Sequence, residues 1–487
     1  MLIRQTLRYL PAQIIGPLSL FIAAVVWTHW LSPRDYGIFT FIVAGQDFAF
    51  LVALSWWSQF MMRHLGELKD DAARQAYQAT ENAVLLLSAL AQGLIALLAL
   101  HLLHLQLSAA LVVIAIAYYL TRNITHHLTD RARNIGSAKA YTFGQSVAPL
   151  AGFLMALALV AGVAATPLAA LTGFTLAQAL GIIGLWWMLD LPLARPALDK
   201  RLLIKAALYG LPLVPAGALG WLGINAIRLV VEHARGTAAV GLIAVGWGLG
   251  QRVASIVAML VTAAAYPLAV SRLQQGSRRD GLEQTARNGL LLIGLVCPAM
   301  AGIVMLDHEL VALLIAPPFQ AITLAILPMA ALAGGITNIR IHVANQAYLL
   351  CQRTDVVVMV NALEAGLAVI FCMIGLSWGG LQAAVAGCAL SAIVTLAIGF
   401  AVSQKRFGLF MDWSAIARFA LATAFMTLLL TPTLWAGVPG GNGLHLVAKI
   451  LTGILAYGLA IAALFPTERR LASDELRALL HLKPQPR

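Results

Sequence analysis

The stretch VGLIAVGWGLGQRVASIVAMLVTAAAY, residues 240–266, contains 27 residues and a single charged side chain, that of Arg252. About 20 predominantly apolar residues in a helix span the hydrocarbon core of a bilayer, so this stretch is long enough to cross a membrane. A charged side chain at the middle of such a helix costs roughly 2.5–3.5 kcal/mol on insertion scales, and it usually faces a cavity or a partner. The stretch therefore predicts a membrane helix that carries a cation deep in the bilayer.

The whole chain has the same character. Of its 487 residues, 61% are apolar and 11% are charged, against about 45–50% and about 25% in soluble domains. This composition excludes a soluble enzyme, because a single globular core does not grow large enough to bury so much apolar surface. Lys and Arg exceed Asp and Glu by 12, an excess that in a membrane protein indicates orientation. We therefore expect no nucleic-acid partner.

Apolar runs bounded by charged residues, Pro and Gly predict about fourteen membrane helices, and twelve or thirteen remain open. Gly334, Gly335 and the polar run around Asn338 could break the tenth run. The start, MLIRQTLRYLP, is not followed by a cleavage site, so we expect a retained first span. The runs are 9–31, 37–61, 81–103, 108–127, 141–163, 168–189, 207–230, 240–266, 289–306, 321–350, 356–376, 381–402, 415–436 and 444–465.

Lys and Arg residues divide unequally between alternate connections. If the N-terminus is cytoplasmic, 24 of the 32 lie in connections on that side, two (Arg34 and Arg235) lie on the other side, and six lie within spans. Cytoplasmic loops carry an excess of Lys and Arg. The division predicts two cytoplasmic chain ends and an even number of spans.

Motifs of the common enzymes and metal sites are missing from the sequence. It has no GxxxxGK[ST] loop, no HExxH, no GxSxG and no paired-cysteine pattern, so we expect no cofactor and no bound metal. The four cysteines, in or beside apolar runs, are interpreted as packing residues. His126-His127 and Asp307-His308-Glu309 are interpreted as surface residues. The connections on the outer side are short, which leaves little room for the acidic loop of a membrane glycosyltransferase or polymerase.

A weak internal repeat links the two halves of the chain. Leu10-Pro11 is followed 26 residues later by Tyr36-Gly37-Ile38-Phe39, and Leu211-Pro212 is followed 29 residues later by Val240-Gly241-Leu242-Ile243. Six predicted spans separate the copies. This spacing is typical of transporters whose two halves face the same way in the membrane.

Charged residues deep in the predicted spans are the candidate functional groups. Three arginines against two acids leave one positive charge in excess, which favours an anionic ligand. Internal ion pairs of Arg228 or Arg340 with Asp47 or Glu364 are an equally good explanation, whereas Arg122, Arg418 and Lys449 lie near span ends and are expected to reach the membrane surface. The deep charges are Asp47, Arg228, Arg252, Arg340 and Glu364.

Several stretches together resemble the Wzx-type polysaccharide flippases of the multidrug/oligosaccharidyl-lipid/polysaccharide exporter superfamily, which also includes MATE drug antiporters and lipid II flippases. The resemblance extends from the first to the twelfth predicted span. The stretches are LSPRDYGIFTF at 31–41, YGLPLVPAGALGWL at 209–222, GTAAVGLIAV at 236–245, RRDGLEQTARNGLLLIGLVCPAMAGIVML at 278–306 and WGGLQAAVAGCAL at 378–390.

The resemblance implies an all-α, polytopic inner-membrane protein with two six-helix lobes around a central cavity and two further C-terminal helices. In relatives, spans one, two, seven and eight line the cavity, which implies that Asp47, Arg228 and Arg252 lie on or near it. Family members often carry an Asp-Arg pair late in span seven, and here Ile227 precedes Arg228. The expected divisions are 1–190 (N-lobe), 191–206 (cytoplasmic linker), 207–403 (C-lobe), 415–465 (spans thirteen and fourteen) and 466–487 (a cytoplasmic amphipathic tail).

The function implied is transport. We expect a flippase that moves undecaprenyl-diphosphate-linked oligosaccharide repeat units from the cytoplasmic to the periplasmic leaflet, for exopolysaccharide, capsule or O-antigen assembly. Arg252, with Arg228 and Arg340, is expected to bind the diphosphate, and Asp47 and Glu364 are candidates for cation coupling or for ion pairs. A polysaccharide polymerase and a chain-length regulator are candidate partners. The alternatives are a multidrug or lipid II transporter of the same fold and, less favoured, a membrane glycosyltransferase or polymerase.

Overall fold

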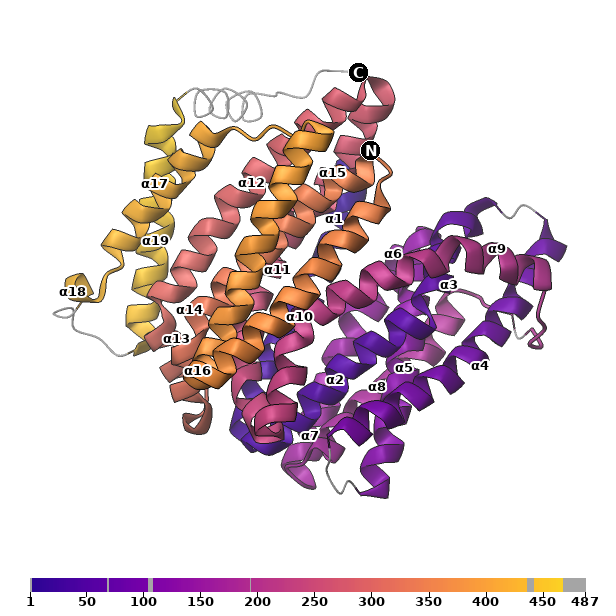
Figure 1. The fold of residues 1–487 in the computed structure, drawn as a ribbon. Helices are drawn as coiled ribbons and strands as arrows, with labels where there is room; N and C mark the ends of the chain where they lie inside the picture. The colour runs from indigo at the N-terminus through magenta and orange to yellow at the C-terminus, as the bar shows by residue number, and fades with distance from the viewer. Residues whose placement is uncertain (1, 68–69, 104–107, 193, 436–441, 467–487) are drawn as a thin grey trace, which may run out of the picture.

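The computed structural model describes residues 2–67, 70–103, 108–192, 194–435 and 442–466. Every regular element in this described part is helical, and Figure 1 shows the helices gathered into two adjoining groups. The all-α fold expected from the sequence is therefore confirmed. The predicted amphipathic tail at 466–487 lies almost entirely outside the described residues.

The first group contains α1 to α8. Its helices pack mainly on one another, with α5 against α4 and α8, and α7 against α8 and α1. The bounds are α1 (Leu2–Trp30), α2 (Pro33–Ala53), α3 (Ser55–His64), α4 (Asp71–Leu102), α5 (Ala109–Asn134), α6 (Ala138–Thr142), α7 (Ala148–Gly162) and α8 (Pro167–Met188).

Helix α9 begins at Lys200, within the predicted linker, and packs on α3 and α4 of the first group (Figure 1). The second group follows from α10 onward. Here α11 packs against α12 and α14, α10 packs against α16, and α17 and α19 pack together beside α12. The bounds are α9 (Lys200–Gly210), α10 (Val214–Arg235), α11 (Thr237–Gln275), α12 (Arg278–Met305), α13 (Asp307–Leu314), α14 (Pro317–Ile339), α15 (Asn345–Leu350), α16 (Thr354–Val402), α17 (Trp413–Leu429), α18 (Pro432–Trp435) and α19 (Asn442–Leu464).

Eleven helical segments of the described chain are long and apolar enough to cross a membrane. The longest, Thr354–Phe407, contains a sharp turn at Gly379 and Gly380, where φ of Gly380 is 66°. The backbone at Gly375 approaches that of Ala383, so the two halves of α16 run back along each other as a hairpin. The eleventh and twelfth predicted runs correspond to these halves, while the total of fourteen spans stays a prediction.

Gly334 and Gly335, which could have broken the tenth predicted span, do not break it. Helix α14 continues without interruption through Gly334 and Gly335, and Gly334 packs closely on the backbone of Gly250 in α11. The irregularity comes later, as a π-helical turn at Arg340–Ala344. Glycine serves here to bring two helices close together rather than to end one.

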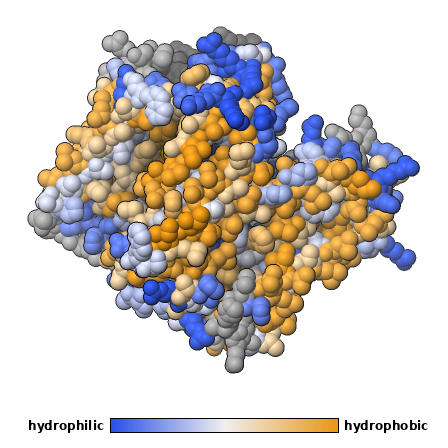
Figure 2. Space-filling view, in the orientation of Figure 1, coloured by the Kyte–Doolittle hydropathy of each residue, from blue (hydrophilic) through white to orange (hydrophobic). Residues whose placement is uncertain are grey.

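Apolar side chains cover the outside of the helical groups. On α4, Leu90 is 74% exposed and Leu94 is 69% exposed. Figure 2 shows that the visible face carries a broad hydrophobic region between hydrophilic margins. Exposed apolar area on this scale is found where lipid replaces water, so the chain forms a multi-pass membrane protein.

The two groups make close contact where α2 and α11 begin. A Cβ atom on Gly37 would meet the backbone oxygen of Thr237, and one on Gly241 would meet the backbone oxygen of Pro33. The two contacts mirror each other, and they involve the glycines of the internal repeat in the sequence. Only glycine allows such an approach of two helix backbones, so these residues hold this end of the two groups together.

Candidate functional site

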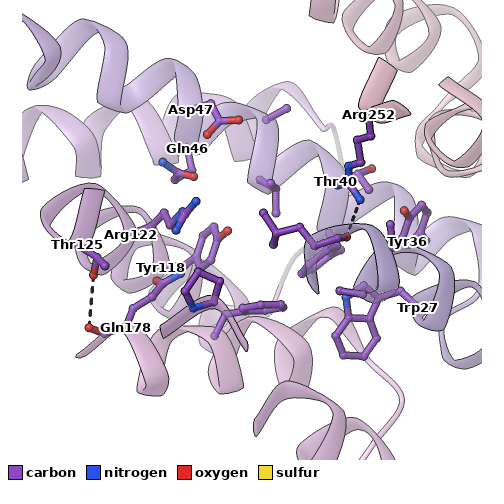
Figure 3. A pocket seen from close by; sticks show the side chains of 18 of the residues that line it. Trp27, Tyr36, Thr40, Gln46, Asp47, Tyr118, Arg122, Thr125, Gln178 and Arg252 are labelled. Atoms are coloured by element: carbon purple, nitrogen blue, oxygen red, sulfur yellow. Dashed lines mark hydrogen bonds between the residues drawn. The ribbon is translucent and has the colours of Figure 1, made fainter. Parts of the chain in front are cut away.

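A polar cavity of about 260 Å³ lies between the two groups (Figure 3). Helices α1, α2, α5, α7 and α8 line it from the first group, and α10 and α11 line it from the second. Because both groups contribute walls, a movement of one group against the other changes the shape of the cavity. It is hereafter called the polar cavity.

Four charged side chains face the polar cavity, and each comes from a different helix: Asp47 from α2, Arg122 from α5, Arg228 from α10 and Arg252 from α11. Their formal charges sum to +2. Within the described part of the chain, no ion pair joins any of them to an oppositely charged side chain. The cavity therefore presents uncompensated positive charge to whatever enters it.

Arg252 lies in the second group of helices, and its side chain is hydrogen-bonded to the first group. Its Nη1 donates a hydrogen bond of 2.6 Å to the backbone oxygen of Leu20 in α1; Figure 3 shows a dashed line that starts at Arg252. The guanidinium makes no other hydrogen bond to a described residue. Its remaining N–H groups are therefore available to an acceptor in the cavity.

Arg228 also keeps an unused donor. Its Nη1 donates to Oδ1 of Asn225, one helical turn earlier, and Nδ2 of Asn225 donates to the backbone oxygen of Trp221 at 3.0 Å. Its Nε is buried and has no hydrogen-bond partner in the described part of the chain. A buried donor without an acceptor costs roughly 1–3 kcal/mol, and an anion bound beside Arg228 removes that cost.

Asp47 and Arg122 lie across the polar cavity from Arg252 (Figure 3). The side chain of Asp47 is exposed within the cavity, although it lies well inside a membrane-spanning helix. A further cavity of about 450 Å³ shares Gln46, Asp47 and Arg122 with the first and continues along α2 and α3 to Gln59. A polar route therefore leads from the polar cavity toward the end of the molecule that carries α3.

The structure brings Asp47, Arg228 and Arg252 into one cavity, as the resemblance implied. It does not bring Arg340 there. Arg340 is 1% exposed and forms an ion pair with Glu364, and its Nη1 donates to Oδ1 of Asn361 at 3.1 Å. The expectation that Arg340 binds the diphosphate is therefore corrected, since its charge is neutralised by protein. The alternative of an internal ion pair explains both Arg340 and Glu364.

Arg122 is the charged residue of the cavity that sequence reasoning did not select. It was expected to reach the membrane surface, and instead it faces the cavity together with Tyr118 and Thr125. The spacing of these three residues, i, i+4 and i+7, places them on one face of α5. That shared polar face was the signal that could have identified it.

Two other expectations are corrected by burial. Lys449 does not reach the surface, because its side chain is 4% exposed and pairs with Glu309 of α13. His127 is fully buried, with Nε2 2.9 Å from Oε1 of Glu81 and Nδ1 2.7 Å from Oγ of Ser58. In the described part of the chain, no group of three or more His, Cys, Asp and Glu side chains is placed to hold a metal ion.

A fold of many apolar helices around a charged internal cavity defines a membrane transporter. The chain belongs to the polysaccharide biosynthesis protein family, whose model matches residues 26–323, and the resemblance to Wzx-type flippases is thereby confirmed. A comparison with curated proteins gives no match.

Solved structures show the same fold at low sequence identity. The structure titled "Lipid II flippase MurJ, inward closed conformation" matches with a TM-score of 0.72 and 12% identity, over 95% of this chain and 99% of that one. An inward-facing multidrug resistance MATE family transporter of the MOP superfamily matches with a TM-score of 0.60 and 14% identity, over 85% and 99%. Identities this low establish the fold and not the substrate.

Proposed function

We propose that this protein moves an undecaprenyl-diphosphate-linked oligosaccharide repeat unit across the inner membrane, from the cytoplasmic to the periplasmic leaflet. The product serves exopolysaccharide, capsule or O-antigen assembly. The observation that carries the proposal is the polar cavity, in which Arg122, Arg228 and Arg252 outnumber a single Asp47. Its membership of a polysaccharide biosynthesis family supports the same substrate class.

The physical obstacle to this transport is the headgroup. A diphosphate and its sugars cannot cross hydrocarbon unaided, whereas a polyprenyl chain can stay in lipid throughout. Arginine forms charge-assisted and often bidentate hydrogen bonds with phosphate oxygens. We assign the diphosphate to Arg228 and Arg252, with Arg122 in the place first expected for Arg340. A rocking movement of the two lobes then exposes the cavity to the opposite leaflet.

The energy source in this proposal is an ion gradient that acts through Asp47. No described residue pairs with its carboxylate, which leaves it open to a proton or a metal cation from the cavity. Asp47→Asn should leave diphosphate binding intact and remove the dependence of transport on a proton or sodium gradient in proteoliposomes. An unchanged dependence would exclude Asp47 as the coupling group.

Two alternative functions fit the cavity less well. An exporter of organic cations needs an acidic lining to attract its substrates, and this cavity has a positive excess. A membrane glycosyltransferase or polymerase changes covalent bonds, while the fold is that of transporters. A lipid II transporter requires similar headgroup chemistry and is separated from our proposal by the lipid that accumulates when the protein is removed.

The N-terminus lies at the same end of the molecule as α6 and α9 (Figure 1). These two helices carry Lys139, Lys200, Arg201 and Lys205. An excess of basic residues favours the cytoplasmic side. We therefore assign this end to the cytoplasm, which agrees with the proposed direction of transport.

The decisive experiment is deletion of the gene followed by complementation. The deletion strain should lack surface polysaccharide and accumulate lipid-linked repeat units that face the cytoplasm. The wild-type gene should restore the polymer, and Arg252→Ala should fail to do so at a normal protein level. Normal polymer in the deletion strain would reject the flippase function, and accumulation of lipid II instead would favour the lipid II alternative.

A further inference from the structure

A third cavity, of about 350 Å³, lies between α2, α4 and α10. Its wall consists of apolar side chains, among them Phe41, Ile95 and Leu222, except at its inner end, where Asn225 and Arg228 face it. It is hereafter called the apolar cavity. Such a space holds hydrocarbon more readily than it holds water.

The apolar cavity adjoins the polar cavity directly. Ala44, Asn225 and Arg228 line both. Arg228 therefore lies at the boundary between the two cavities, and its buried Nε has no hydrogen-bond partner among the residues that the structure describes. A cation at the junction of an apolar and a polar space suits a ligand that carries an anionic group between an apolar and a polar part.

The apolar cavity also reaches the lipid-facing surface. Leu98 lines it and is 59% exposed on the outer face of α4, where Leu94 and Leu97 are exposed as well. On the other side, Trp221 of α10 donates from Nε1 to the backbone oxygen of Ala44 in α2 at 3.1 Å. The cavity thus lies where the first group of helices meets the second, and it opens toward the bilayer.

We propose that the apolar cavity holds the part of the polyprenyl chain nearest the diphosphate while the headgroup occupies the polar cavity. This inference rests on the proposed function and names the path of the tail. The order of the ligand, hydrocarbon then diphosphate then sugars, matches the order of the site, apolar cavity then Arg228 then polar cavity. The tail remains in apolar surroundings throughout, because the cavity joins the lipid to the headgroup site.

Another apolar cavity, of about 440 Å³, lies between α12, α14 and α17. It is similar in size and lining, but it shares no residue with the polar cavity. A chain bound there would have to cross packed helices to reach Arg228. This cavity therefore provides the matched control for the proposal.

The test is photo-crosslinking of the full-length protein in lipid nanodiscs. The probe is an undecaprenyl diphosphate with a diazirine on the isoprene unit nearest the diphosphate. We expect labelled peptides from α4 and α10, and competition by unlabelled undecaprenyl diphosphate. Two results would overturn the proposal. The first is labelling confined to α12 and α17. The second is labelling that unlabelled undecaprenyl diphosphate does not reduce, which is the result expected of a site filled by membrane phospholipid.

Substitutions then separate the tail path from the headgroup site. Ala218→Phe fills the apolar cavity and should reduce crosslinking at least fivefold, while Ala301→Phe, in the other cavity, should not. Binding of inorganic diphosphate, which has no isoprene unit, should persist in Ala218→Phe and so report an intact headgroup site. Normal crosslinking in Ala218→Phe with loss of both ligands in Arg228→Ala would reject the tail path and leave the proposed function standing.

Discussion

The arginines of the polar cavity differ from the other deep arginine in what surrounds their charge. Arg340 is neutralised by Glu364, whereas Arg122, Arg228 and Arg252 face a shared space with no described acidic partner within ion-pair distance. Burial of an isolated charge in a dry interior is expensive, so these three side chains require water or an anion beside them. The difference at the level of single residues separates a binding group from a structural one.

Arg122→Ala should weaken transport although sequence reasoning did not select this residue. A hydrogen bond to a charged group is worth about 1.5–3 kcal/mol, so the affinity for the headgroup should fall by about 10- to 100-fold. The measurement is binding of geranyl diphosphate to purified protein. Arg418→Ala is the matched control, because Arg418 lies over the ring of Phe465 away from the cavity. Equal binding by the two variants would remove Arg122 from the site.

Arg340→Ala should act on stability rather than on the ligand. Removal of one partner leaves the carboxylate of Glu364 buried and unpaired, which costs about 3–5 kcal/mol. The thermal unfolding midpoint in detergent should therefore fall, and the double variant Arg340→Met, Glu364→Leu should recover most of it. If the double variant stays stable but no longer binds geranyl diphosphate, Arg340 belongs to the binding site after all.

At the scale of elements, the contact between α2 and α11 lies beside the polar cavity, which Tyr36 lines. Tyr36 of α2 packs edge-on against Phe319 of α14 with ring centroids 5.7 Å apart, beside the approach of Gly37 and Gly241. The backbone nitrogen of Ala316 donates to Oγ1 of Thr28 at 3.2 Å in the same region. These contacts hold the two groups together at the end opposite α3, while the polar route toward α3 and Gln59 leads the other way.

Gly37→Leu should separate this contact, because the added side chain meets the backbone oxygen of Thr237, which cannot move aside as a flexible side chain does. Thr40 lines the polar cavity. In a cysteine-free protein with Thr40→Cys, we expect the introduced thiol to react faster with a membrane-impermeant maleimide added from outside. Gly366→Leu is the control, since a Cβ there meets no neighbour. An unchanged reaction rate in Gly37→Leu would show that the contact between α2 and α11 does not limit access to the polar cavity from outside.

At the scale of the whole molecule, the two groups of helices enclose a positively charged cavity within an apolar exterior. The net charge of this cavity favours anions over organic cations, and the attraction for anions is reduced by salt to the extent that the cavity is hydrated. Inorganic diphosphate should therefore bind about tenfold more weakly in about 500 mM than in about 50 mM NaCl, as measured by calorimetry. An organic cation such as ethidium should not compete. Competition by ethidium would instead favour a drug exporter.

Much of the fold follows from the linear pattern of residues. The apolar run at 240–266 lies within α11 as expected, and the deep position of Arg252 correctly predicted a residue that faces a cavity. Helix ends were less predictable, because α4 and α12 begin at Asp71 and Arg278, about ten residues before the apolar runs. Propensity continues a helix beyond the membrane, and hydropathy does not detect that part.

The sequence by itself determined that this chain spans a membrane, which residues carry charge into it, and that positive charge is in excess there, since these properties depend only on the order of apolar and polar residues. Only the tertiary structure decided which of those charges share a space. Arg122 faces the polar cavity and Arg340 does not, because helix rotation and packing set the direction of each side chain. Spacing along one helix does not contain that information about its neighbours.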